Sequence, residues 1–83
     1  RSKLLKEYRE ALVYGKPPEE REAIVDNMME FNRRIPNIKS YQITKDTVLR
    51  SIRGMARQTG RSLRGVELTK EERALFFPYD LYK

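Results

Sequence analysis

The chain has 83 residues, a mass of 9.9 kDa and a formal net charge of +6, so it has room for one small domain only. Hydrophobic residues make up 39% and charged residues 36%, which predicts a single soluble domain over residues 1–83 with a small core. No segment is long and apolar enough for a membrane span or a signal peptide. Because the sequence begins with Arg1 and not with Met, we expect a fragment of a larger polypeptide.

The sequence contains neither cysteine nor histidine. It therefore lacks disulfides and thiolate ligands, and also the side chain that most often serves as general base and metal ligand. The neighbouring carboxylates Glu19-Glu20 and Glu71-Glu72 point to different sides of a helix, which is typical of a helix start and not of a catalytic pair. We expect no enzyme, no catalytic residue, no metal, no cofactor and no small-molecule substrate.

The positive charge is concentrated in the middle of the chain. Residues 1–32 contain six bases and seven acids, and residues 65–83 contain three bases and four acids. Residues 33–64 contain nine bases and one acid. Since the flanks are nearly neutral, they cannot compensate this excess, and we expect a positive field on the folded surface.

Two amphipathic helices are predicted in the first part of the chain. Leucine, tyrosine and alanine recur at helical spacing from Ser2 to about Tyr14, and Gly15 with Pro17-Pro18 forms a turn. The second helix begins near Pro18 and ends before Pro36. Its apolar face is the set Ile24, Met28, Phe31 and Ile35, widened by Val25 and Met29.

A polar connection over residues 37–42 follows, in which we expect Ile38 and Tyr41 to be anchored in the core. Thr44 is a suitable N-cap for a third helix, Lys45 to about Thr59. Its apolar face is the set Val48, Ile52, Met55 and Thr59, with Leu49 and Ala56 beside it. Gly54 inside this helix costs about 1 kcal/mol relative to Ala unless a neighbouring helix crosses closely there.

The last predicted helix is short, from Lys70 to about Phe76, and Thr69 with Glu72 matches a capping box at its start. Val66 to Leu68 alternates like a short extended segment before it. Together these elements predict an all-α fold, a small open bundle of three main helices and a short C-terminal helix.

Arginines form the most informative pattern. Arg50, Arg53 and Arg57 project from the polar face of the third helix within an arc of about 60°. Arg61 and Arg64 continue the series beyond the helix. Two interpretations stay open: a row of guanidinium groups that binds phosphates or an acidic protein groove, or a solvated helix face. Five arginines without an intervening acid favour binding, because arginine offers planar bidentate bonds.

The chemistry of the partner can be narrowed. No aromatic residue occurs between Tyr41 and Phe76, which disfavours recognition of single strands by stacking. Only Gln58 is available near the arginines to read base edges. Any contact with double-stranded DNA would therefore be directed at its backbone. The aromatic tail is a second candidate surface for docking on a protein, through Phe77, Tyr79, Leu81 and Tyr82.

Several short segments resemble the C-terminal module of the large polyvalent proteins of tailed bacteriophages and prophages, some of which are named for a Pro-Leu-x-Arg-Phe-Gly motif. The matching segments are Tyr8-Arg9-Glu10-Ala11, Phe31-Asn32-Arg33-Arg34-Ile35-Pro36, Ile43-Thr44, Leu49 to Arg57, and Gly65-Val66-Glu67-Leu68. The naming motif is absent, and the aromatic tail departs from the pattern. In this frame Phe31 would be a core anchor, and Asn32 would bond backbone groups in the turn.

The resemblance implies a module of a protein that is packaged in the virion and enters the host during genome ejection. We therefore expect a non-enzymatic structural or docking module, located in the virion or in the bacterial cytoplasm after ejection. Its partners would be other virion proteins, the rest of the parent polypeptide, or the backbone of packaged DNA. The main alternative is a free-standing helical domain that binds nucleic acid without sequence specificity, and a third hypothesis is a regulatory piece of a larger enzyme.

Overall fold

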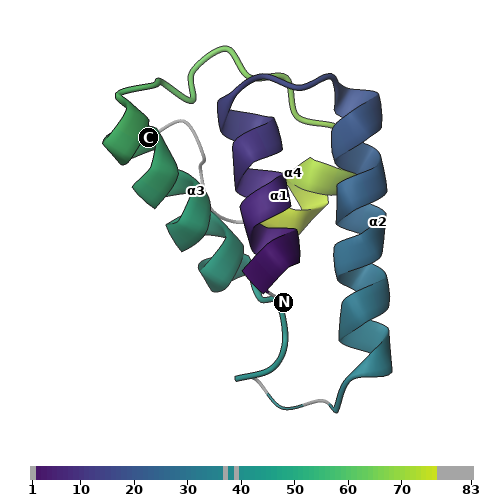
Figure 1. Ribbon diagram of the computed structural model, residues 1–83. Helices are drawn as coiled ribbons and strands as arrows, with labels where there is room; N and C mark the ends of the chain where they lie inside the picture. The colour runs from purple at the N-terminus through teal and green to yellow at the C-terminus, as the bar shows by residue number, and fades with distance from the viewer. Residues whose placement is uncertain (1, 37, 39, 77–83) are drawn as a thin grey trace.

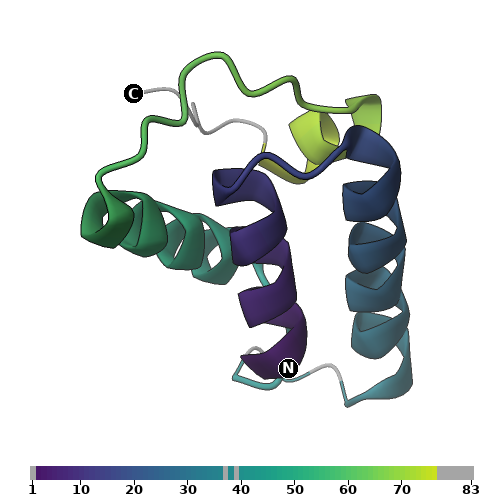
Figure 2. The same cartoon turned by 45° about the horizontal axis from the view of Figure 1, so that its top comes forward.

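The computed structural model describes residues 2–36, 38 and 40–76, and this part of the chain is all-helical, as predicted. Its helices are α1 (Ser2–Val13), α2 (Pro18–Arg34), α3 (Lys45–Thr59) and the short α4 (Lys70–Phe76). α1 lies between α2 and α3 and packs against both, while α4 contacts α3 (Figures 1 and 2). None of these helices has the length and apolar character that a membrane crossing requires.

Backbone chemistry accounts for the α1–α2 hairpin. Gly15 adopts a left-handed conformation with φ 79°, and the amide of Lys16 donates to the carbonyl of Ala11 at 2.8 Å, which closes the end of α1. Pro18 then occupies the first turn of α2, where a missing N–H group has no consequence. The predicted corner is confirmed, and it turns α2 back along α1.

Local signals also set both ends of α3. The Oγ1 atom of Thr44 accepts a hydrogen bond from the amide of Thr47 at 3.3 Å, as expected of an N-cap. Ile43 and Val48 on either side of this cap are both buried. At the other end Gly60 is left-handed, with φ 69°, and its amide bonds the carbonyls of the last turn. The predicted boundaries of α3 are confirmed.

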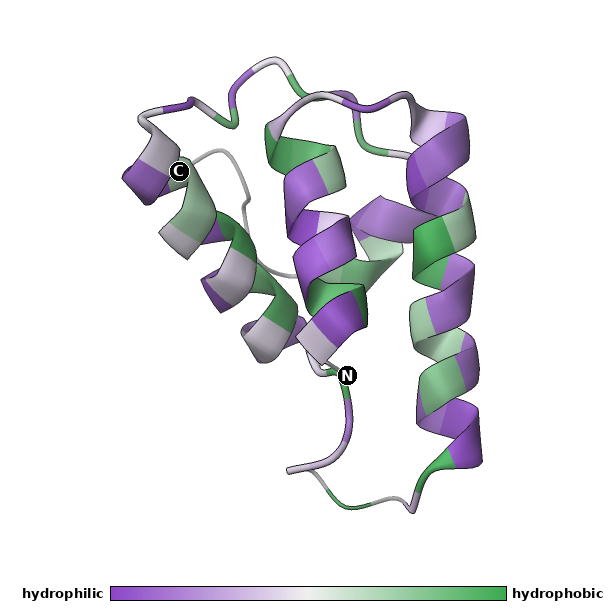
Figure 3. Cartoon of the chain, in the orientation of Figure 1, coloured by the Kyte–Doolittle hydropathy of each residue, from purple (hydrophilic) through white to green (hydrophobic). Residues whose placement is uncertain are grey.

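The core forms where the apolar faces of α1, α2 and α3 meet. Figure 3 shows hydrophobic residues of α3 on its side toward α1 and hydrophilic residues on its outer side. The buried apolar side chains are Leu5, Tyr8, Ala11, Leu12, Val13, Val25, Met28, Ile43, Val48, Leu49, Ile52, Ala56 and Phe76. Leu63, Val66 and Leu68 pack against this core from the α3–α4 connection. Val66 and Leu68 are partly buried and Glu67 between them is exposed, so the predicted alternation is confirmed. The described residues form no strand here.

Two expected core anchors are wrong. Ile38 and Tyr41 lie on the surface, with 49% and 56% of their area exposed, and Met29 and Thr59 are exposed as well. The reason is the path of the connection, which folds into a turn in which the amide of Tyr41 donates to the carbonyl of Ile38 at 2.9 Å. Ile43, one residue before the N-cap, is the side chain that enters the core.

Asn32 joins this connection to α2. Its Nδ2 atom donates to the carbonyl of Ile43 at 3.0 Å, and its Oδ1 atom accepts from the amide of Ile43 at 2.8 Å. The side chain thus pairs with both backbone groups of one residue, as a neighbouring β-strand would. The expectation that Asn32 bonds backbone groups of the turn is confirmed, and the contact sets where α3 begins.

A buried polar network, the Tyr8–Arg21–Glu72 network, holds the short helix α4 against α1 and α2. The carboxylate of Glu72 is completely buried and accepts hydrogen bonds from the Tyr8 hydroxyl at 2.5 Å and from Arg21 Nε at 3.0 Å. Its second oxygen accepts from Arg21 Nη2 at 3.1 Å and from the amide of Thr69 at 2.9 Å. In the described residues no buried side-chain nitrogen or oxygen lacks a hydrogen-bond partner.

Arg21 connects this network to two loops. Its Nη1 atom donates to the carbonyl of Lys16 at 2.9 Å, and its Nη2 atom donates to the carbonyl of Glu67. One guanidinium therefore ties the α1–α2 turn to the segment that leads into α4. Because breaking a buried pair leaves an uncompensated charge, each partner here is far more sensitive to substitution than a surface charge.

The network also shifts the pKa values of Glu72 and Tyr8. Burial on its own raises the pKa of Glu72, but hydrogen bonds from Arg21, Thr69 and Tyr8 and the positive charge of Arg21 outweigh it, so this pKa lies below its ordinary value. Burial, together with the bond to Glu72 and its negative charge, raises the pKa of Tyr8. Glu72 is thus a carboxylate and Tyr8 a neutral phenol at neutral pH.

We predict that Glu72→Gln lowers the free energy of unfolding by about 3 kcal/mol, because the amide keeps the shape and leaves the Arg21 charge buried without a counterion. Urea denaturation, monitored by circular dichroism, measures the change in unfolding free energy. Glu71→Gln is the matched control, since Glu71 is exposed in the same turn and its replacement changes little. Equal stability of the two variants would contradict the role of the network.

The contribution of Glu72 depends on pH. Because its pKa is lower in the folded than in the unfolded protein, its stabilising effect is present above the ordinary glutamate pKa of about 4.3. We expect the gap in unfolding free energy between the native chain and Glu72→Gln to shrink as the pH falls below about 4. Denaturation series between neutral and strongly acidic pH test this, and a gap that stays constant would show that charge is not the cause.

Candidate functional site

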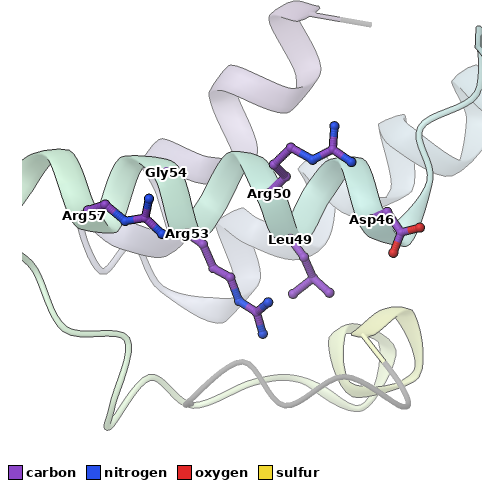
Figure 4. A pocket seen from close by; sticks show the side chains of 6 residues that line it. All are labelled: Asp46, Leu49, Arg50, Arg53, Gly54 and Arg57. Carbon is purple, nitrogen blue, oxygen red and sulfur yellow. The ribbon is translucent and has the colours of Figure 1, made fainter.

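The candidate site is the arginine face of α3, defined as Arg50, Arg53 and Arg57. All three side chains are exposed. The opposite face of the helix contributes Val48, Ile52 and Ala56 to the core, so packing fixes the orientation of the arginine face. The structure brings these three predicted residues together along one helix (Figure 4).

A shallow hollow of about 370 Å³ lies on this face, lined by Asp46, Leu49, Arg50, Arg53, Gly54 and Arg57. Figure 4 views this face, with Leu49 and Arg53 extending toward one of its edges, Arg50 toward the opposite edge, and Asp46 at the N-terminal end of α3. Gly54 lies between Arg50 and Arg57 along the helix. The hollow therefore has three cationic side chains around it and one carboxylate at its end.

Basic residues outside α3 differ from those on α3 in whether they form ion pairs. Arg33 and Arg34 both pair with the carboxylate of Glu30, at 2.7 and 2.9 Å. Neither Arg50 nor Arg57 makes an ion pair within the described residues, whereas Arg53 has a further interaction within the molecule. The positive excess of residues 33–64 is consequently expressed mainly on α3 and the turn that follows it.

Arg61 and Arg64 belong to neighbouring surfaces and not to the hollow. The guanidinium of Arg61 lies over the ring of Tyr14, 4.8 Å from its centroid, in a cation–π contact. Arg64 borders a second hollow, of about 310 Å³, beside the α1–α2 turn. The series of five predicted arginines is therefore divided into a group of three on α3 and two residues beyond Gly60.

The predicted aromatic docking tail, with Phe77, Tyr79, Leu81 and Tyr82, lies outside the described residues. Its neighbour Phe76 is the last described residue and is buried, with its ring tilted against Tyr8 at a centroid distance of 6.4 Å. The tail therefore stays a prediction.

Sequence reasoning missed Arg21 and Tyr14. Arg21 precedes Ile24, Val25 and Met28 by three, four and seven residues, so a charged side chain on the apolar stripe was the available signal. Tyr14, in the turn after α1, brings an aromatic ring to the basic turn from a part of the chain remote in sequence, which no local pattern indicates.

Among the described residues, no group of three or more acidic side chains is placed to hold a metal ion. Comparison with protein-family models, with curated proteins and with solved structures gives no match to this chain. The case for a function therefore depends on the geometry of the arginine face itself.

Gly54 offers a test of how α3 is built. Its backbone does not have positive φ, and a Cβ atom placed on it would meet no described atom within 4 Å apart from its chain neighbours and the backbone of its own helix. We predict that Gly54→Ala raises the free energy of unfolding by about 1 kcal/mol through helix propensity. Thermal denaturation measures the change.

The matched control is Gly60→Ala at the C-cap of the same helix. Because Gly60 has a left-handed backbone, the same substitution there destabilises by about 1 kcal/mol. A loss of stability in Gly54→Ala would show that some part of the fold needs the glycine.

Proposed function

We propose that this chain is a non-enzymatic docking module that binds an anionic partner through the arginine face. The observation that carries the proposal is the presentation of three exposed guanidinium groups on one side of a helix whose other side is locked in the core. Arginine forms bidentate hydrogen bonds with carboxylate and phosphate groups, so such a row is complementary to an anionic surface.

The proposal that the module is not an enzyme is supported by the composition and by the buried charges. The sequence has no histidine or cysteine, and the buried acid of the described residues, Glu72, is fully used in the network with Tyr8 and Arg21. Its pKa lies below the ordinary value, which is opposite to what a general acid at neutral pH requires.

For the biological setting we keep the one implied by the resemblance to the polyvalent phage proteins. In this setting the module belongs to a virion protein that is ejected with the genome, and its partner is another virion component, the parent polypeptide or packaged DNA. What supports it is the set of matching segments, and the role of Asn32 in the turn agrees with it. The alternative, a free-standing nucleic-acid binder, would use the same arginine face. Binding experiments with DNA and with an acidic peptide distinguish the two hypotheses.

The proposed function is tested with two anionic probes, duplex DNA and a synthetic glutamate-rich helical peptide. We expect the native chain to bind at least one of them, and the triple variant Arg50→Gln, Arg53→Gln, Arg57→Gln to bind at least ten-fold more weakly. Fluorescence anisotropy at several salt concentrations gives the affinities, and if DNA is bound, its affinity should fall steeply with salt.

A control variant distinguishes the effect of the arginine face from the effect of net charge. The triple variant Lys3→Gln, Lys6→Gln, Lys70→Gln removes the same charge from exposed positions outside the hollow. We expect it to retain most of the affinity. Equal losses in the two variants, or no binding of either probe by the native chain, would reject the proposed function.

A further inference from the structure

Nothing in the described part of the molecule requires a glycine at position 54. It lies inside α3, where glycine costs about 1 kcal/mol relative to alanine, and its backbone does not have positive φ. Apart from its chain neighbours and the backbone of its own helix, no described atom lies within 4 Å of the position that a Cβ atom would take, so no neighbouring helix crosses closely there within the described chain. The described fold therefore contains no close helix crossing that would require glycine at this position.

The position of Gly54 is also distinctive. It borders the hollow and follows Arg50 by four residues and precedes Arg57 by three, so the three residues lie on one side of α3. The absent side chain leaves the helix backbone open at the edge of the cationic surface, beside Arg50. Glycine permits such close approach of another backbone, and the distance between two packed helices depends on the side chains at their contact.

We infer that Gly54 is the crossing point for an acidic helix of a partner protein, whose carboxylates bind Arg50 and Arg57 on either side of the contact. This inference rests on the proposed function and specifies its partner. Arg50 and Arg57 are about 10.5 Å apart along the helix axis, at a rise of 1.5 Å per residue. Carboxylates seven residues apart on a facing helix, which is about two turns, match that spacing.

Charge complementarity favours a protein helix over a nucleic acid. Apart from its charged residues, the hollow is lined by Leu49, which is almost completely buried, and by Gly54, which has no side chain. Neither residue offers a side-chain hydrogen bond to a phosphate, whereas the space left by Gly54 can receive a side chain of a facing helix. Asp46 lies at the end of the same hollow and repels any anion placed there. A phosphate backbone carries negative charge at every step, whereas an acidic helix can have a basic residue opposite Asp46 and its carboxylates opposite Arg50 and Arg57. Arg53 has an interaction of its own in the molecule, so the inference depends on Arg50 and Arg57.

The experiment introduces a side chain at the crossing point. In the full chain, Gly54→Leu and Gly54→Ala are compared for binding to an alanine-based helical peptide with glutamates at positions i, i+4 and i+7, and to duplex DNA. We expect Gly54→Leu to weaken peptide binding at least ten-fold and Gly54→Ala to weaken it less. Circular dichroism should show both variants folded, because a Cβ atom at this position has open space beside it and alanine and leucine both favour helix over glycine.

Ala23→Leu is the matched control, since it adds the same side chain to an exposed position on α2 and should leave peptide binding unchanged. Peptide binding by Gly54→Leu at native affinity would overturn the inference while the arginine variants decide the proposed function separately. Binding of duplex DNA without binding of the peptide would also overturn it, and would leave the proposed function in its nucleic-acid form. Loss in the Gly54 variants only, with full peptide binding by the arginine variant, would reject the ion pairs with Arg50 and Arg57.

Discussion

The carboxylate of Glu72 is the point at which three helices and two loops of this small protein are joined. It receives bonds from Tyr8 on α1, from Arg21 on α2 and from the amide of Thr69 at the start of α4. A buried charge is tolerated only when its hydrogen bonds and its countercharge are both supplied, and here both are. In a chain with a small apolar core, this requirement gives α4 a single position.

The network has consequences for the surface that we assign to binding. Arg21 ties the carbonyl groups of Lys16 and Glu67 together, so the basic segment after α3 is held near the α1–α2 turn. The Arg61 guanidinium over the Tyr14 ring adds a second contact across the same boundary. The arginine face is therefore carried by a helix that is fixed at its apolar side and followed by a tethered loop, which lowers the entropy that binding must overcome.

Much of the fold could be predicted because its signals are local. The ends of α3 follow from Thr44 and Gly60, the α1–α2 corner from Gly15 and Pro18, and the start of α4 from the reciprocal bonds of Thr69 and Glu72. Ile38 and Tyr41 were placed wrongly because hydrophobicity alone does not say which way a turn directs a side chain. The arginines of α3 could be grouped from helical spacing, but the hollow between them could not, because its shape depends on the helix as packed.

By itself the sequence determined the four helices, their caps and the gathering of positive charge on one face of α3, since each depends on residues less than about two turns apart. Only the tertiary structure decided that Arg21 and Glu72 form a buried pair 51 residues apart and that Tyr14 meets Arg61. It also decided that Gly54 stays open to the surface. The physical reason is that burial and neighbourhood are set by how helix faces pack together, and a pattern along one helix does not contain its neighbours.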